Sequence, residues 1–214
     1  LLRVLREMER NGIKVDVHEL NELETKYKNL LDGLTNEIYE MAGTNFNINS
    51  PKQLGEVLFD VLGLKSKSNK KDSTNVSVLN ELVGQHPIVQ KILEYRQYFK
   101  LYSTYIKAYL GCKDVHDFVH TTFNQTLTAT GRLSSNDPNL QNIPSRSNEG
   151  KMLRKIFIPS TPNGSLVSAD YSQIELRLLA NFSGDDRLID AYNQGEDIHS
   201  ITASEIFGIP LSMV

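Results

Sequence analysis

The residues best suited to chemistry lie in one short stretch, where an apolar run ends in a carboxylate. Residues 166 to 169 (Leu-Val-Ser-Ala) predict a buried strand, and Asp170 follows directly. Ligand crevices form at the carboxyl ends of strands in open α/β sheets. Hard cations such as magnesium prefer carboxylate and carbonyl oxygens. Asp170 is therefore a candidate metal ligand, although the same residue would also suit the plain end of a strand.

A helix is expected directly after this carboxylate. Ile174, Leu178 and Phe182 have the spacing of one helical face. Ser172-x-x-Glu175 matches a capping box, with Ser172 as the N-cap residue. Local sequence alone therefore gives Glu175 a structural role and no catalytic one.

The remaining elements predict an α+β fold, with a helical part followed by an antiparallel sheet and helices. The expected helices cover residues 1–10, 16–42, 51–62, 76–83, 87–109, 174–182, 186–193 and 197–207, and the expected strands cover 119–123, 126–130, 152–158 and 166–169. Residues 65–75 predict a polar, mobile loop, and residues 131–145 a long irregular segment of the kind that is usually functional. Two parts follow from this order, residues 1–112 and 113–214.

Composition is ordinary for a globular protein, with 39% hydrophobic and 23% charged residues in 214. No apolar run approaches the roughly 20 residues that span a bilayer, so no membrane partner is expected. The single cysteine, Cys112, excludes an internal disulfide and predicts a cytoplasmic, reducing location.

Charge is unevenly distributed along the chain, although the net charge is only −3. Residues 91–155 hold ten Lys/Arg and five Asp/Glu, whereas residues 156–214 hold two and eight. Such a distribution suits a protein that binds phosphates with one surface and metal with another. Two ordinary solvated surfaces would give the same numbers.

One histidine pair resembles a metal-binding motif. His116-Asp117-Phe118-Val119-His120 has the spacing of the H-E-x-x-H zinc motif, which requires a helix and a Glu. Here the segment continues into β-type sequence, in which positions i and i+4 lie about 13 Å apart. A zinc hydrolase is therefore a weak alternative.

Three stretches of the sequence carry a resemblance to a known family. They are residues 128–135 (TATGRLSS), 137–144 (DPNLQNIP) and 170–177 (DYSQIELR). In this order and spacing they closely resemble the family A DNA polymerases, and the similarity extends over the whole chain. The resemblance implies that residues 1–112 form a helical thumb-like subdomain. Residues 113–214 would then form the N-terminal part of the palm.

The resemblance also implies an activity, the DNA-templated addition of dNTPs to a primer with two Mg²⁺ ions. Asp170 matches the first of the family's two metal-binding aspartates, and the backbone carbonyl of Tyr171 would also bind metal. Glu175 matches the gate that excludes the ribose 2′-hydroxyl. His199 and Gln173 match residues at the incoming nucleotide.

Primer–template DNA is the expected macromolecular partner, and the protein is expected to be a monomer. Residues that match DNA-binding positions of the family are Arg96, Lys100, Arg132, Gln141 and Asn142. A family lysine is replaced by Tyr102, which predicts fewer contacts between thumb and DNA. Gly184-Asp185-Asp186 is similar to the paired aspartates of some polymerases, but it precedes a helix, so capping by Ser183 and Asp186 is the better interpretation.

The sequence given starts without Met and ends at Val214, before the family's fingers helix and second catalytic aspartate would occur. We therefore expect a piece of a larger enzyme that does not polymerise alone. A DNA-binding module without catalysis remains the main alternative.

Overall fold

The computed structural model describes residues 1–66 and 73–213. Most of the predicted polar loop, residues 67–72, lies outside the described residues. The chain divides into two compact units, Leu1–Leu166 and Val167–Val214, here called the N-terminal and the C-terminal unit. The predicted boundary between a thumb-like part, residues 1–112, and a palm part, residues 113–214, is a different division and stays a prediction. Among the described residues, no helix is long and apolar enough to cross a membrane.

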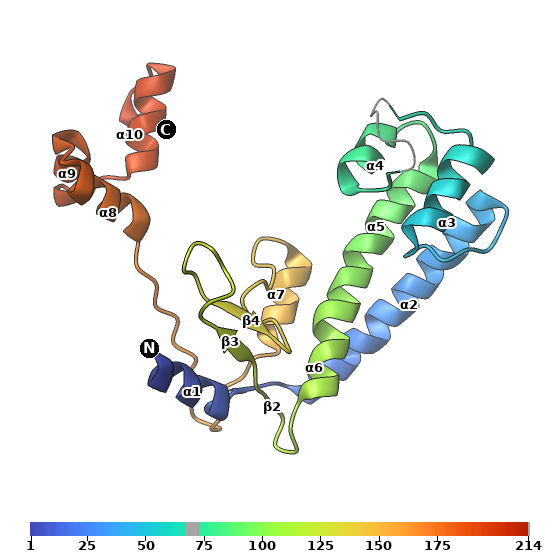
Figure 1. Cartoon of the computed structure of the whole chain (residues 1–214), viewed down its shortest axis with the longest axis horizontal. Helices are drawn as coiled ribbons and strands as arrows, with labels where there is room; N and C mark the ends of the chain where they lie inside the picture. The colour runs from blue at the N-terminus through green and yellow to red at the C-terminus, as the bar shows by residue number, and fades with distance from the viewer. Residues whose placement is uncertain (67–72, 214) are drawn as a thin grey trace. The chain divides into compact units, whose positions relative to one another are not determined.

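Two long helical segments form the frame of the N-terminal unit (Figure 1). One is α2 (Val17–Ala42). The other is a continuous series of α5 (Pro87–Leu101), the π-helical segment η2 (Tyr102–Ile106) and α6 (Lys107–Cys112). At one end they pack against the shorter α3 (Pro51–Gly55), its π-helical continuation η1 (Glu56–Val61) and α4 (Val76–Leu82).

Local capping explains where these helices begin. The carboxylate of Asp16 accepts hydrogen bonds from the backbone N–H groups of His18 and Glu19, at 3.0 and 3.2 Å. The Ser50 hydroxyl and the Asn75 side chain cap α3 and α4 in the same way. The predicted starts of these helices are therefore confirmed.

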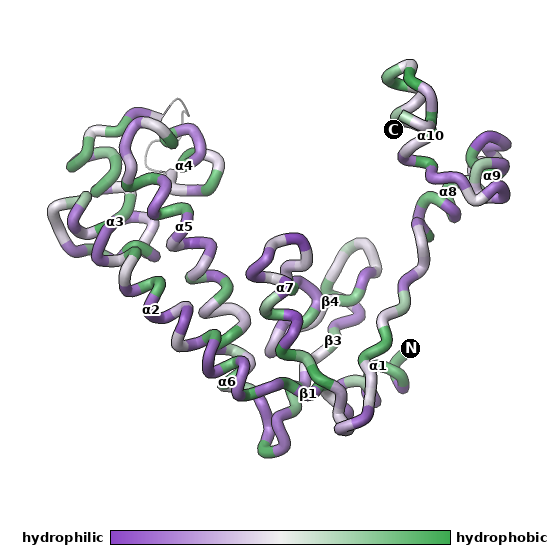
Figure 2. Tube along the Cα trace, turned by 180° about the vertical axis from the view of Figure 1, so that it is seen from behind, coloured by the Kyte–Doolittle hydropathy of each residue, from purple (hydrophilic) through white to green (hydrophobic). Residues whose placement is uncertain are grey.

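Apolar stripes on the two long segments meet in two adjoining clusters of buried residues. The first, towards α3 and α4, includes Ile38, Leu54, Leu58, Leu79, Leu82, Ile88 and Ile92, each fully buried. The second includes Leu20, Tyr105, Tyr109, Val119 and Ile156. Figure 2 shows apolar and polar positions alternating along both segments. Burying each large apolar side chain contributes about 1.5–3 kcal/mol, so the helix pair rests on these stripes.

Two small antiparallel sheets and two helices complete the N-terminal unit. Helix α1 (Leu2–Asn11) precedes β1 (Ile13–Lys14), which pairs with β2 (Phe118–Val119). Strand β3 (Thr122–Asn124) pairs with β4 (Ser134–Asn136), and α7 (Asn148–Lys155) follows. The predicted α+β class is confirmed.

Two strand predictions in this unit are wrong. Residues 126–130 form bends and a turn, since Thr128 bonds locally: its hydroxyl donates to the carbonyl of Arg132 at 2.6 Å. Residues 148–155 form helix α7 instead of a strand over 152–158. Ser147 caps this helix by accepting the Gly150 N–H at 3.0 Å, and basic residues occupy its last turn.

The C-terminal unit contains α8 (Ile174–Ser183), α9 (Asp186–Asn193), α10 (Ile198–Phe207) and the short 3₁₀ turn η3 (Leu211–Met213). Glycines with left-handed backbones end α8 and α10, as predicted.

Three local predictions from Leu166 onward need correction. Residues 166–169 form no strand, because no described residue pairs with them, and Val167 is 89% exposed. The N-cap of α8 is Gln173, in a left-handed conformation and without a side-chain cap, and not Ser172. Asp185, rather than Ser183 or Asp186, caps α9 by accepting the Leu188 N–H at 3.1 Å.

Asp16→Ala is expected to lower the free energy of unfolding by about 1 kcal/mol, because two N–H groups of α2 lose their acceptor. Urea denaturation followed by circular dichroism measures this change. Asp16→Asn is the matched control and should keep most of the stability, since an amide oxygen also caps. Equal stabilities of Asp16→Ala and the unchanged chain would contradict the assignment.

Candidate functional site

The predicted site residues fall into two groups, one in each unit. In the C-terminal unit, Asp170 and Tyr171 lie in the irregular stretch before α8, and both side chains are exposed. Exposure leaves the Asp170 carboxylate open to an ion from solvent, as a metal ligand requires.

These two residues offer hard oxygen donors of the kind that magnesium prefers. Magnesium usually binds one or two carboxylates, and waters and substrate phosphates complete its shell. Within residues 1–66 and 73–213, no group of three or more His, Cys, Asp or Glu side chains is placed to hold a metal ion. Asp170 and the Tyr171 carbonyl therefore fit as part of a metal site and do not make a complete one.

Gln173 links the beginnings of two helices in this unit. Its Nε2 donates to Asp197 Oδ1 at 3.1 Å, and its Oε1 accepts from the Tyr192 hydroxyl at 3.1 Å. Its backbone is left-handed, with φ of 51°, which turns the chain into α8. The amide therefore ties the start of α8 to α9 and to the cap of α10.

Asp197 is the N-cap of α10 and receives several hydrogen bonds. Donation from the Gln173 amide, and then from the His199 N–H and the Ser200 hydroxyl, lowers the pKa of the Asp197 carboxyl. The His199 side chain is exposed on the first turn of this helix. That turn attracts anions, because its N–H groups and the helix dipole are oriented toward them.

Sequence reasoning missed the partners that stabilise this arrangement. The Arg177 guanidinium lies over the Tyr192 ring, with Cζ 4.5 Å from the ring centroid, and its Nε donates to the Ser172 carbonyl at 2.9 Å. Asp197 carries a capping signal in the sequence, but no local pattern indicates its bond to Gln173. Glu175 lies in the first turn of α8 with an exposed side chain, close to this network in sequence.

In the N-terminal unit, Gln141 and Asn142 lie in the irregular segment of residues 137–142 after β4, called the turn below, and both residues are exposed. The Asn139 side-chain oxygen accepts the backbone N–H groups of Gln141 and Asn142, at 2.9 and 3.2 Å. These bonds fix the peptide backbone of the turn and leave the two amide side chains at the surface.

The basic residues of the predicted DNA surface differ in their surroundings. Arg132 and Lys100 are exposed. Arg96 is partly buried, and its guanidinium donates to the carbonyl and, at 3.2 Å, to the hydroxyl of Thr74. Burial lowers the pKa of Arg96. Arg96 thus has a structural contact, and its DNA-binding role stays a prediction.

Tyr102, at the position of a family lysine, packs against both apolar clusters and is partly buried. Its ring therefore belongs to the packing of the helix pair.

The histidine pair does not lie on a helix. Residues 115–117 form a turn and bend that lead into β2, as the β-type sequence predicts. His120 Nδ1 lies 2.8 Å from the Glu9 carbonyl oxygen, and Nε2 lies 3.6 Å from Asp114 Oδ2. These contacts give His120 a structural role between α1 and β2.

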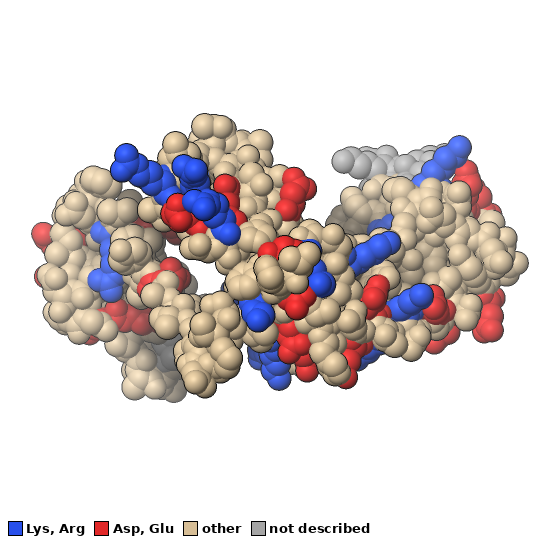
Figure 3. Space-filling model, turned by 90° about the horizontal axis from the view of Figure 1, so that it is seen from below, with Lys and Arg blue, Asp and Glu red and all other residues tan. Residues whose placement is uncertain are grey.

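Acidic and basic side chains are interspersed on the face of the molecule in Figure 3.

Comparison with known proteins gives the context of these residues. The model of DNA polymerase family A matches residues 17–214. This chain belongs to that family. Enzymes of the family depend on metal ions.

Relatives and a solved structure agree with the family assignment. The chain is 50% identical to DNA polymerase I of Helicobacter pylori (strain J99), over 99% of this chain and 23% of that protein. It is also 50% identical to DNA polymerase I of Geobacillus stearothermophilus, over 98% of this chain and 24% of that protein. The fold matches the POL domain of Pol1 from M. smegmatis in complex with DNA primer-template and dNTP, with a TM-score of 0.84, 39% identity and coverage of 98% and 38%. The chain thus spans about a quarter of the length of these curated relatives.

Gln173→Leu is expected to raise the pKa of Asp197 towards its ordinary value, because the largest stabilisation of the carboxylate is lost. Carbon-13 NMR titration of the carboxyl group measures this. In the unchanged chain, Asp197 contributes stability above about pH 4, and that stability is lost as pH falls through the lowered pKa of the folded state.

Gln194→Leu replaces another glutamine of the unit, exposed at the end of α9, and should leave the pKa of Asp197 unchanged. Identical titrations for Gln173→Leu and Gln194→Leu would contradict the assigned bond.

Proposed function

We propose that this chain is the thumb and the first part of the palm of a DNA-directed DNA polymerase. The enzyme would extend a primer on a DNA template with dNTPs. The observation that carries the proposal is the family match over residues 17–214, which includes all three motifs. It is supported by likeness to a polymerase domain solved with DNA primer-template and dNTP.

Asp170 and the Tyr171 carbonyl would hold Mg²⁺ in this enzyme, and exposure of the Asp170 carboxylate supports the role. Two bound ions would stabilise charge on the attacking and leaving oxygens of an in-line phosphoryl displacement. Both residues lie in the irregular segment before α8, outside any helix.

The incoming nucleotide would lie against the starts of α8 and α10. His199 is on the first turn of α10, where helix N–H groups favour phosphate. Gln173 connects the two helix starts through Asp197, which supports a fixed spacing between them. The Glu175 carboxylate would lie against the sugar and exclude a 2′-hydroxyl.

Primer–template DNA would bind the N-terminal unit. Lys100 and Arg132 offer exposed cations to phosphates, and Arg96 would add a third cation if its contact with Thr74 yields to DNA. Gln141 and Asn142 offer amide donors that suit minor-groove acceptors shared by several base pairs. Such contacts fit an enzyme that is indifferent to sequence.

The same proposal takes the enzyme to act as a monomer in the cytoplasm. The single cysteine is free and exposed, which suits a reducing compartment.

Asp170→Ala is expected to reduce primer extension by about a thousandfold or more, because loss of a metal ligand removes several kcal/mol of transition-state stabilisation. The measurement uses a chimera in which residues 1–214 replace the aligned segment of the Geobacillus stearothermophilus enzyme. Extension of a labelled primer with Mg²⁺ is followed by gel electrophoresis.

Asp186→Asn is the matched control and should leave primer extension unchanged. Asp186 is an exposed carboxylate of the same unit and is not the N-cap of α9. A chimera that binds DNA but extends no primer would favour the DNA-binding module. Full activity of Asp170→Ala would remove Asp170 from the metal site.

Glu175→Ala in the chimera is expected to raise the ratio of ribonucleotide to deoxynucleotide incorporation by about tenfold to a hundredfold, because a steric barrier to the 2′-hydroxyl is removed. Single-nucleotide incorporation rates for matched rNTP and dNTP give this ratio. Glu196→Ala removes another exposed carboxylate of the unit and should not change the selectivity. An unchanged ratio for Glu175→Ala would exclude the gate role.

A further inference from the structure

The turn that carries Gln141 and Asn142 is attached to the long helix by a buried hydroxyl. Tyr105 is 2% exposed, and its hydroxyl donates to the Asn142 carbonyl oxygen at 2.5 Å. Burial raises the pKa of Tyr105, and a phenol is protonated at neutral pH even without this shift. The bond therefore joins the buried core to the surface turn at a single backbone atom.

Two further hydrogen bonds hold the same turn, one from Tyr109 of α6 and one to Ser135 of β4. The Tyr109 hydroxyl donates to the Asn139 carbonyl at 3.4 Å, and the Ser135 hydroxyl oxygen accepts the Leu140 N–H at 3.0 Å. Together with the Asn139 side chain, these contacts determine the backbone of the turn. Gln141 and Asn142 take no part through their side chains, which remain exposed.

The π-helical segment η2 accounts for the direction of Tyr105. A π turn holds one more residue within its hydrogen-bonded ring than an α turn does, so it changes the phase of the helix. Tyr105 lies inside η2, and its ring centroid is 6.1 Å from the ring centroid of Tyr109 in α6. Both hydroxyls reach the same turn from adjacent places on the helix.

We propose that Tyr105 is a positioning residue that holds the exposed amide side chains of Gln141 and Asn142 in place for primer–template DNA. This inference rests on the function proposed above. The hydroxyl touches neither DNA nor nucleotide in this scheme and acts through the Asn142 peptide.

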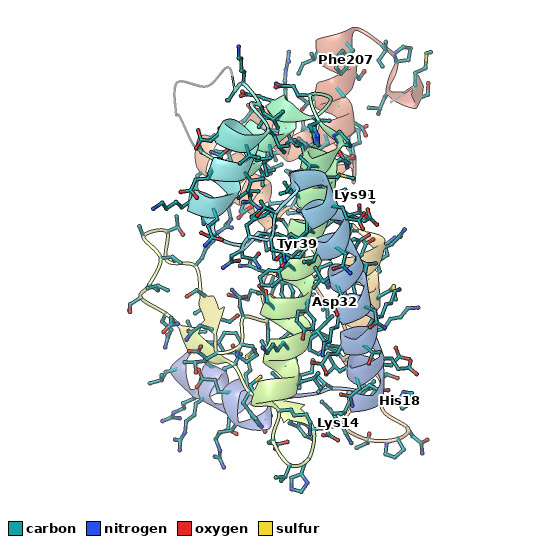
Figure 4. The ribbon with its side chains drawn as sticks, turned by 90° about the vertical axis from the view of Figure 1, so that its right-hand side faces the viewer. Lys14, His18, Asp32, Tyr39, Lys91 and Phe207 are labelled. Carbon is teal, nitrogen blue, oxygen red and sulfur yellow. The ribbon has the colours of Figure 1, made fainter. Side chains whose placement is uncertain are left out.

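A tyrosine hydroxyl with only a structural role could make the same hydrogen bond, but its removal would not change the Kd for DNA. Tyr39 provides a matched control, because its hydroxyl also donates to a backbone carbonyl, that of Phe46, at 2.7 Å. Tyr39 lies on α2 away from the end of the helix pair at which Lys14 and His18 lie (Figure 4). Tyr39→Phe thus removes an equivalent bond without affecting the turn.

The test measures the Kd for primer–template DNA by fluorescence anisotropy in the chimera, for Tyr105→Phe, Gln141→Ala and the double variant. Tyr105→Phe should weaken binding about fivefold, the effect of one lost hydrogen bond. Gln141→Ala should weaken binding in the unchanged background and add little in the Tyr105→Phe background. Tyr39→Phe should leave the Kd unchanged and combine additively with Gln141→Ala.

Asn139→Ala is the second variant if Tyr105→Phe fails to fold by circular dichroism, because it releases the same turn from within. The same coupling to Gln141→Ala is expected. A Kd for Tyr105→Phe equal to that of Tyr39→Phe would overturn the positioning role. Additive effects of Tyr105→Phe and Gln141→Ala on the Kd would also overturn it. A chimera with unchanged residues 1–214 that binds no primer–template would instead overturn the proposed function.

Discussion

Burial of one apolar stripe on α2 against the α5–η2–α6 series is the interaction on which the N-terminal unit depends. Fully buried residues such as Leu20 and Ile38 come from different turns of α2 and join different clusters. Tyr98 and Tyr102 pack against both clusters, so the two adjoin along one helix pair. Since dense interiors deform little, a helix packed along its length keeps its side chains in fixed directions.

This rigidity explains how exposed polar residues are held in place on short irregular segments. Loops carry function well when a rigid scaffold positions them. In the N-terminal unit the scaffold reaches the surface through the Tyr105 hydroxyl. In the C-terminal unit, the side chain of Gln173 has the corresponding role between helix starts. Both devices are side-chain hydrogen bonds to groups that begin or turn a segment.

Helices were predictable from sequence where a cap and a periodic stripe coincide, as at Asp16, and the cap alone indicated the helix after Asp197. The strands at 126–130 and 166–169 were not, because a strand depends on partners that local composition does not specify. The candidate site was predicted from motif resemblance, which supplies residue types but not contacts. The engagement of Arg96 with Thr74 and of Gln173 with Asp197 depends on tertiary structure, so no local pattern indicates either.

The π-helical segment η2 has a consequence for how the chain length can vary during evolution. Each residue added to or removed from a helix rotates everything beyond it by about 100°. A π turn holds one more residue than an α turn, so a deletion of one residue within Tyr102–Ile106 would convert η2 to α-helix and leave α6 packed against α2. Lineages should therefore accept a one-residue change within η2 or in the exposed bends of residues 126–130, whereas the same change within α5 would turn Tyr109 away from Asn139.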